Sequence, residues 1–183
     1  MQLKLVQAAA LAAALAGCAA PGPSESSVPS LRLAPAALGR SLALQQHVTV
    51  RAAGREQQMD VLLEADPARV KLAVVALGQV AARIEWDGRA LDEWHASWWP
   101  ATVSSARILN DMQLSLWPLA AVQAALPPGW QAGDDGDVRT LSQAGVAVAV
   151  VRHAGPGTIE FEQRRDHYSL TIVSQVAGGG GSP

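Results

Sequence analysis

The sequence predicts a mainly β protein in which a curved antiparallel sheet is covered by two or three helices. Three observations predict this class. Apolar residues recur at every second position before residue 101 and again after residue 137, as in strands with one buried face. Between those blocks the period lengthens to three or four residues, as in amphipathic helices. Hydrophobic residues make up 49% of the 183, enough for one folded core.

The block before residue 101 predicts a meander of five strands. Asp87-Gly88 follows the fourth strand and is a strong hairpin signal, because both residues tolerate positive φ. Strands joined by such short turns pair antiparallel. The predicted strands are Leu42–Val50, Met59–Leu63, Val70–Val74, Val80–Trp86 and Arg89–Ala96, and the other turns are Ala53-Gly54, Asp66-Pro67 and Leu77-Gly78.

Two helices are predicted in the middle of the chain. The first covers 102–116, where neither Gly nor Pro occurs and where Ser104 or Ser105 can cap the start. Pro118 interrupts it, since proline disfavours helical geometry in the preceding residue, and a second helix follows to Leu126. The apolar face of the first helix holds Leu109, Met112 and Leu116, and that of the second holds Leu119, Val122 and Leu126.

After the helices the chain returns to period two. The Gly- and Asp-rich residues 133–137 predict a polar turn, and four strands are expected after it. Ile159 and Phe161 alternate with two glutamates, which indicates a sheet with one wet and one buried face. The four strands are Val138–Ser142, Val146–Val151, Thr158–Gln163 and Tyr168–Val173.

Residues 1–17 have the layout of a bacterial export signal. Lys4 is their only charge, and the apolar run that follows is shorter than the roughly 20 residues of a membrane-spanning helix. The next residue completes Leu15-Ala16-Gly17-Cys18, which matches the lipobox of bacterial lipoproteins. We therefore expect cleavage before Cys18 and lipid attachment to its thiol. A chance cysteine beside an ordinary cleavage site is the alternative.

The lipobox sets the expected location and domain boundaries. Ala19, and not Asp, follows the cysteine, which under the lipoprotein sorting rule implies the periplasmic face of the outer membrane. Acyl chains would hold the mature chain there. We expect a signal peptide at 1–17, a lipid anchor and flexible Pro- and Ser-rich tether at 18–38, a folded domain at 39–176 and a disordered Gly/Ser tail at 177–183.

Charge and motifs argue against several function classes. Fourteen Lys and Arg stand against 16 Asp and Glu without a basic block, so no nucleic-acid partner is expected. One cysteine excludes an intramolecular disulfide. No nucleophile elbow, phosphate loop or zinc motif occurs, so we expect no enzyme, catalytic residue, metal or cofactor. We interpret Asp166-His167 as a turn and not as a catalytic pair. The residues from Asp134 to Asp137 lack the final Glu of a calcium loop.

Tryptophan supplies six of the eight aromatic residues. These side chains could simply form the core, but Trp98-Trp99 would point to opposite faces of a strand, so at least one should meet solvent, a membrane or a cavity. A curved sheet with helices on its concave face can enclose an apolar cavity, whereas close packing of an Ala-rich chain is the alternative. The expected lining is Val74, Trp86, Trp94, Trp98, Trp99, Leu109, Met112, Leu116 and Trp117.

The order of elements over residues 40–175 resembles the LolA and LolB proteins, the periplasmic carrier and outer-membrane receptor of bacterial lipoproteins. The resemblance implies an incomplete antiparallel β-barrel covered by helices, with a hydrophobic cavity for acyl chains. In LolB, an exposed Leu before a Gly, in a loop between early strands, helps to deliver cargo to the membrane. Here Leu77-Gly78 has the corresponding place, so the resemblance implies a membrane-delivery role for Leu77.

Two stretches also resemble an uncharacterised family of LolB-like lipoproteins that is often encoded in aryl polyene biosynthesis clusters. They are Ile108–Pro118, ILNDMQLSLWP, and Leu126–Trp130, LPPGW. An aryl polyene is a long, flat, conjugated acyl chain that tryptophan could stack against.

The resemblances imply a monomeric outer-membrane lipoprotein that binds a lipid or acyl chain, either a lipoprotein or an aryl polyene lipid. It would aid transfer or insertion of that cargo at the outer membrane, with a LolA-like periplasmic carrier as partner. The alternative is a structural adaptor whose exposed tryptophans dock a partner protein of a biosynthesis or export assembly.

Overall fold

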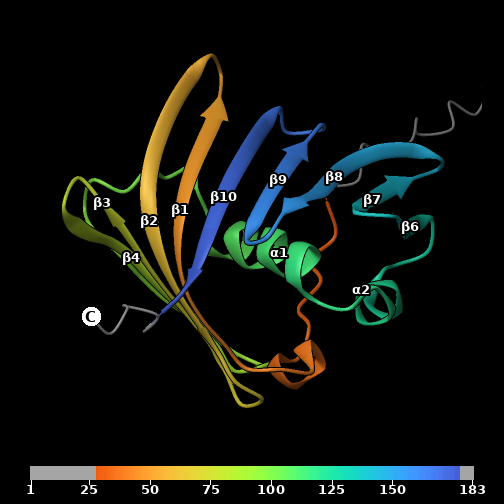
Figure 1. The fold of residues 1–183 in the computed structure, drawn as a ribbon, viewed down its shortest axis with the longest axis horizontal. Helices are drawn as coiled ribbons and strands as arrows, with labels where there is room; N and C mark the ends of the chain where they lie inside the picture. Colours follow the sequence, from red (N-terminus) through yellow and green to blue (C-terminus); the bar gives the residue numbers. More distant parts are fainter. Residues whose placement is uncertain (1–27, 178–183) are drawn as a thin grey trace, which may run out of the picture.

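Ten antiparallel strands form one unclosed sheet that curves around two helices (Figure 1). This computed structural model describes residues 28–177, so the predicted export signal, Cys18 and the last six residues lie outside the described residues. The strand order is β5-β4-β3-β2-β1-β10-β9-β8-β7-β6. Two meanders therefore meet where β1 pairs with β10, between Leu44↔Val176 and Ala52↔Tyr168.

The two meanders flank the helices in the chain. The first contains β1 (Leu42–Ala52), β2 (Arg55–Ala65), β3 (Val70–Ala76), β4 (Gln79–Trp86) and β5 (Leu91–His95). The second contains β6 (Trp130–Asp135), β7 (Val138–Gln143), β8 (Val146–Gly155), β9 (Thr158–Gln163) and β10 (Tyr168–Val176). Between them lie α1 (Ser105–Leu116) and α2 (Leu119–Ala125), and a 3₁₀ helix, η1 (Pro35–Leu38), precedes β1. The prediction of a mainly β protein with an open antiparallel sheet is confirmed.

One strand was not predicted. Residues 130–135 form β6, which includes Gly133 to Asp135 of the predicted polar turn, and the turn itself is Gly136-Asp137. Gly and Asp disfavour strands, but pairing with β7 from Trp130↔Gln143 to Asp135↔Val138 holds them extended. Because β6 lies at the edge of the sheet, its polar side chains can face water.

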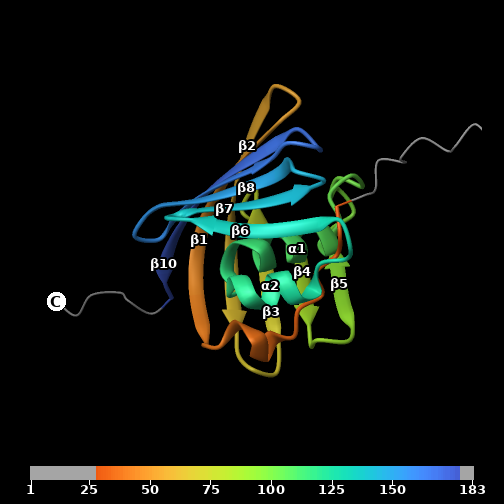
Figure 2. The same cartoon turned by 90° about the vertical axis from the view of Figure 1, so that its right-hand side faces the viewer.

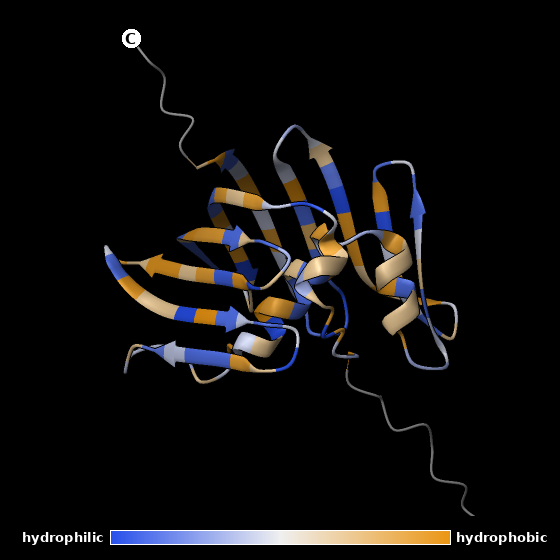
Figure 3. Ribbon diagram, turned by 90° about the horizontal axis from the view of Figure 1, so that it is seen from below, coloured by the Kyte–Doolittle hydropathy of each residue, from blue (hydrophilic) through white to orange (hydrophobic). Residues whose placement is uncertain are grey.

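The core lies between the concave face of the sheet and α1 (Figures 1 and 2). Residues paired across neighbouring strands project to the same face, so Leu63, Leu72 and Ile84 form one row, and all three are buried. Their chain neighbours project to the convex face, where exposed polar side chains such as Glu64 and Lys71 prevail. Figure 3 shows this alternation of hydrophobic and hydrophilic residues along the strands.

Residues 28–38, which the sequence assigns to the tether, pack against α1; we call them the strap. Leu31, Leu33 and Leu38 are buried. Gln113 of α1 accepts a hydrogen bond from the Leu33 amide and donates one to the Leu33 carbonyl oxygen, both at 3.0 Å. Side chains far along the sequence thus hold the strap, so residues 28–38, which the prediction assigned to a flexible tether, are part of the described fold.

Further side chains bind the strap backbone. Trp86 Nε1 donates to the Leu33 carbonyl at 2.7 Å, and Trp117 Nε1 donates to the Ala34 carbonyl at 3.1 Å. Asn110 Oδ1 accepts from the Leu31 amide at 3.0 Å. These contacts give the buried indole N–H groups of both tryptophans the partners that they require.

At both ends of α1, side chains form hydrogen bonds with backbone groups that have no partner within the helix. Ser104 is the N-cap, and its hydroxyl accepts from the Arg107 amide. At the other end the buried Arg139 donates to the carbonyl oxygens of Leu114 and Trp117, at 2.9 and 2.6 Å. Asp134 holds the same guanidinium through two hydrogen bonds, at 2.8 and 3.0 Å. A cation at a helix C-terminus opposes the helix dipole.

Candidate functional site

One side of α1 faces the middle of the sheet. Asp111 contacts Tyr168 of β10, and the Ser105 hydroxyl lies 2.8 Å from His95 Nε2 of β5. Since β1 to β4 lie between those two strands, the helix side between these two contacts faces β1 to β4. At about 100° per residue, Ile108 and Met112 project from that side.

Apolar side chains on both sides of this interface stay partly exposed, and we call them the apolar band. Its helix members are spaced by four residues, which places them on one face. Its sheet members share the concave face through the pairs Val50↔Leu170 and Val48↔Ile172. The band consists of Ile108, Met112 and Leu116 of α1, Leu44 and Val50 of β1, Met59 of β2, and Leu170 and Ile172 of β10. By contrast, Leu109 and Leu114 on other sides of α1 are buried.

The expected cavity residues separate into several groups. Val74, Trp86, Leu109 and Trp117 are buried in the core, whereas Met112 and Leu116 belong to the apolar band. Beside Trp86 and Leu109, between α1 and the strap, a hollow of about 10 Å³ remains. That volume corresponds to about one water molecule.

Trp94 lies on the convex face, away from the helices. It pairs with Arg83, whose guanidinium lies 5.3 Å from the indole ring. Its chain neighbours Glu93 and His95 project to the concave side, so the strand period of two turns Trp94 outward. With its side chain 49% exposed, Trp94 does not join the apolar band.

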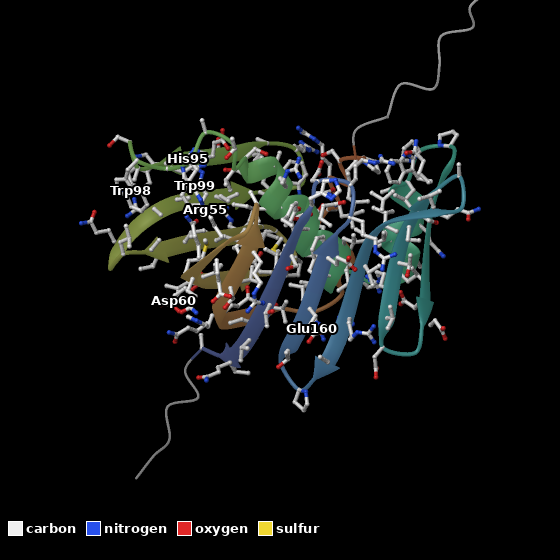
Figure 4. All side chains as sticks on the ribbon, turned by 90° about the horizontal axis from the view of Figure 1, so that it is seen from above. Arg55, Asp60, His95, Trp98, Trp99 and Glu160 are labelled. Atoms are coloured by element: carbon white, nitrogen blue, oxygen red, sulfur yellow. The ribbon has the colours of Figure 1, made fainter. Side chains whose placement is uncertain are left out.

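The Trp98-Trp99 pair lies in the loop 96–104 and not in a strand, and its two side chains differ in exposure. Trp99 is partly buried, stacks on the His95 ring at 5.6 Å and donates from Nε1 to the Val103 carbonyl at 2.8 Å. Trp98 is 43% exposed. Trp99 therefore fixes the loop 96–104, and Trp98 is presented to solvent (Figure 4).

Leu77 lies at the tip of the β3–β4 hairpin with its residue 90% exposed. Its φ is 54° and that of Gly78 is 72°, so both turn residues are left-handed. That geometry matches the strand twist but is usually occupied by Asn-Gly or Asp-Gly, because a larger side chain is strained there. The hairpin thus exposes a large apolar side chain at a position that disfavours it.

A polar cluster lies next to the apolar band. The Tyr168 hydroxyl donates to Asp111 at 2.5 Å, and Arg107 pairs with Asp166 and lies 5.7 Å from the Tyr168 ring. Burial raises the pKa of the Asp111 carboxyl to about 7, although the hydrogen bond from Tyr168 and the charge of Arg107 act to lower it. Burial and the neighbouring Asp111 raise the pKa of the Tyr168 phenol.

The described residues contain no group of three or more His, Cys, Asp or Glu side chains that could hold a metal ion. Asp134 is engaged by Arg139, and Asp166 by Arg107. His167, the neighbour of Asp166, is an exposed turn residue with a φ of 55°. Within residues 28–177, no helix is both long and apolar enough to cross a membrane.

The central part of the chain matches a known family. A model for proteins of unknown function, DUF3261, matches residues 43–176, which includes both helices and nearly the whole sheet. The chain belongs to the DUF3261 family. No curated protein matches it.

Within this DUF3261 domain, the sequence analysis named Met112, Leu116 and Leu77 as candidate site residues, but it did not name the sheet half of the apolar band.

The sequence analysis also did not predict the hydrogen bonds that the polar side chains of α1 make. Asp111 and Tyr168 are 57 residues apart, and Gln113 and Leu33 are 80 apart, so no local pattern connects them. The only available signal was the presence of Asn110, Asp111 and Gln113 in a helix that the apolar pattern predicts to be central. Polar residues on a buried helix require partners.

Proposed function

We propose that this DUF3261 domain binds the acyl chain of a lipid along the apolar band, as a non-enzymatic lipoprotein of the outer membrane. The observation that carries the proposal is that Ile108, Met112 and Leu116 face an apolar sheet surface, yet both sides stay partly exposed. Leaving such surfaces in water forgoes about 25 cal/mol for each Å². An acyl chain between them would recover that energy.

The geometry suits a chain-like ligand. From Ile108 to Leu116 the helix rises about 12 Å, and the apolar surface is continuous along that length. A LolA/LolB-like half-barrel is part of this proposal, and it is supported by the open sheet that curves around α1.

Delivery of the ligand belongs to the exposed tip of the β3–β4 hairpin. Leu77 projects from the same end of the sheet at which α1 begins, so a ligand leaving the apolar band toward that end would pass it. In this proposal Leu77 enters the membrane surface, as the resemblance to LolB implies. Lipid anchorage through Cys18 would keep the domain within reach of that surface.

The proposal is tested with the mature chain from Ala19, which retains every residue of the described fold. A fatty acid that carries an environment-sensitive fluorophore should bind it, and Met112→Glu should weaken binding at least tenfold. Leu62→Glu is the matched control, because Leu62 is 46% exposed on the convex face. Equal affinities for the two variants, or no binding by the folded native chain, would contradict acyl binding.

The adaptor function remains a second candidate because of one feature of the convex face. Leu62, Ala73, Arg83 and Trp94 are successive cross-strand neighbours there, and Leu62 and Trp94 are strongly exposed. Such a row is a possible protein-docking surface. Site-specific photocrosslinking from position 94 in cells would favour this candidate if it captured one defined envelope protein, and would oppose it if it captured none.

A further inference from the structure

Several connections lie at one end of the sheet, which we call the rim. The rim consists of the turns 53–54, 77–78, 144–145 and 164–167 and the loop 96–104, because alternate connections of an antiparallel meander fall at the same end. In Figure 1 the tip of the β1–β2 hairpin and the β9–β10 turn are at the top, and the β3–β4 turn is at the left. Figure 4, seen from above, shows Arg55, Trp98 and Trp99 on this end.

The rim combines exposed apolar side chains with arginines. Leu77 and Trp98 project from it, as described above. Arg55, the first residue of β2, is exposed and forms no ion pair with another described residue, whereas the exposed Arg164 pairs with Glu162 at 3.1 Å. The arginines at the rim are Arg51, Arg55, Arg107, Arg164 and Arg165, and the carboxylates there are Glu56, Glu162 and Asp166.

The opposite end has a different character. Its turns 66–69 and 87–90 each carry one Asp and one Arg. Asp66 and Asp87 accept hydrogen bonds from the amides of their own turns, which closes these turns without exposing a large apolar side chain. This end exposes Val176 of β10 but, among the described residues, no tryptophan, so arginines and an exposed tryptophan are combined at the rim.

The strap shows where the preceding chain enters the domain. Ser30 lines the same small hollow as Ala106, which is at the start of α1 beside the rim, whereas Pro35 lies close to Gly88 at the opposite end. Figure 2 shows the strap beginning beside the loop 96–104. Only nine residues lie between Cys18 and Val28, and the two are therefore at most about 35 Å apart. An acylated Cys18 would thus anchor the chain on the rim side.

From these placements we infer that the rim docks on an anionic bilayer surface, the membrane in which the chain is anchored. This inference rests on the proposed function, in that it requires acylation of Cys18. Arginines attract anionic headgroups, and an exposed tryptophan favours the membrane interface because its ring is apolar and its N–H is polar. Docking would orient the apolar band with one end toward the lipid. In this orientation Trp98 and Arg55 would contact the membrane.

The experiment uses the acylated mature chain bound to vesicles. A single cysteine is introduced as Ala101→Cys in the rim loop or as Ala68→Cys at the opposite end, and is labelled with an environment-sensitive fluorophore. Cys18 is blocked by its lipid, and mass spectrometry verifies a single label. In vesicles of phosphatidylcholine with phosphatidylglycerol, the emission of the rim label should shift to the blue, and that of the Ala68→Cys label should not.

Charge and tryptophan variants test the chemistry of docking. Arg55→Glu with Arg164→Glu should abolish the shift of the rim label, whereas Arg40→Glu with Arg89→Glu, the same change of charge at the opposite end, should not. Trp98→Ala should reduce it, and Trp94→Ala, which removes an equally exposed indole from the convex face, should leave it unchanged.

Three results would overturn the inference. The labels at the two ends could respond equally, the rim label could shift equally in pure phosphatidylcholine, or its shift could arise from contact between copies of the chain. Acyl binding is measured on the mature chain without a membrane. A failure of docking therefore leaves acyl binding standing, and a failure of acyl binding does not by itself remove the docking signal.

Discussion

The Tyr168 hydroxyl donates a 2.5 Å hydrogen bond to the Asp111 carboxyl, which joins the start of β10 to the middle of α1. Asp111 is buried, and its pKa is about 7 in the folded protein against 3.8 for the unperturbed group. The folded state therefore keeps a proton that the unfolded state releases. Between pH 4 and pH 7 this difference lowers the free energy of unfolding as the pH rises.

Asp111→Asn should remove that loss. We expect the variant to be more stable than the native protein at pH 8, by about 1.4 kcal/mol for each unit of pKa shift, and similar to it near pH 4. Urea unfolding at pH 4.5, 6 and 8 measures the difference. Tyr168→Phe should act in the opposite direction at pH 8, because it removes the donor of the carboxylate. A native stability that does not fall between pH 4 and pH 7 would contradict the burial of an ionisable Asp111.

Arg139 should be among the least tolerant charged positions. Arg139→Met leaves Asp134 without its partner and the last carbonyls of α1 without a donor, so we expect a loss of about 3 kcal/mol in the free energy of unfolding. Arg152→Met is the control, since Arg152 is exposed and its nearest carboxylate, Glu160, is 3.8 Å away. It should cost less than about 0.5 kcal/mol in the same denaturation experiment. Similar losses for both variants would argue against the capping role.

Gln113 should determine how firmly the strap is held. Gln113→Ala removes both hydrogen bonds to Leu33, and trypsin should then cut after Arg32 at least tenfold faster than in the native chain. Gln79→Ala, a truncation of an exposed glutamine, should leave the cleavage rate unchanged. Mass spectrometry of the digest identifies the cut. An unchanged rate in Gln113→Ala would show that the buried leucines and the hydrogen bonds from Asn110, Trp86 and Trp117 secure the strap without Gln113.

Substitutions of Leu77 should affect the stability of the fold and the delivery of the ligand in different ways. Leu77→Asn relieves the left-handed strain at the hairpin tip, so we expect a gain of about 0.5–1 kcal/mol in the free energy of unfolding. Leu77→Glu should keep the fold because the side chain packs against little. Both variants should lose transfer of an acylated ligand from the protein to vesicles, measured by fluorescence. Unfolding of Leu77→Glu would contradict an exposed tip, and unimpaired transfer would contradict the delivery role.

The sequence predicted most of the strands because their signals are local. The strand at Thr158–Gln163 has the predicted bounds, and the hairpin turns at Gly54 and Gly78 lie where they were predicted. The strap was missed because Pro- and Ser-rich composition indicates a tether, and its hydrogen bonds come from Asn110 and Gln113, about 80 residues away. The site shows the same limit. Leu116 could be assigned to a helix face by spacing, but that Val50 and Leu170 share one face of the sheet depends on strand order.

The open sheet leaves two strands, β5 and β6, with one unpaired backbone edge each. Exposed edges recruit further strands and lead to aggregation unless they are short or charged. β5 has five residues, including Asp92 and Glu93, and β6 carries Gly133, Asp134 and Asp135. The acidic residues that concealed β6 from sequence analysis are thus of the kind that disfavours edge-to-edge pairing, which lets the sheet stay open without recruiting further strands.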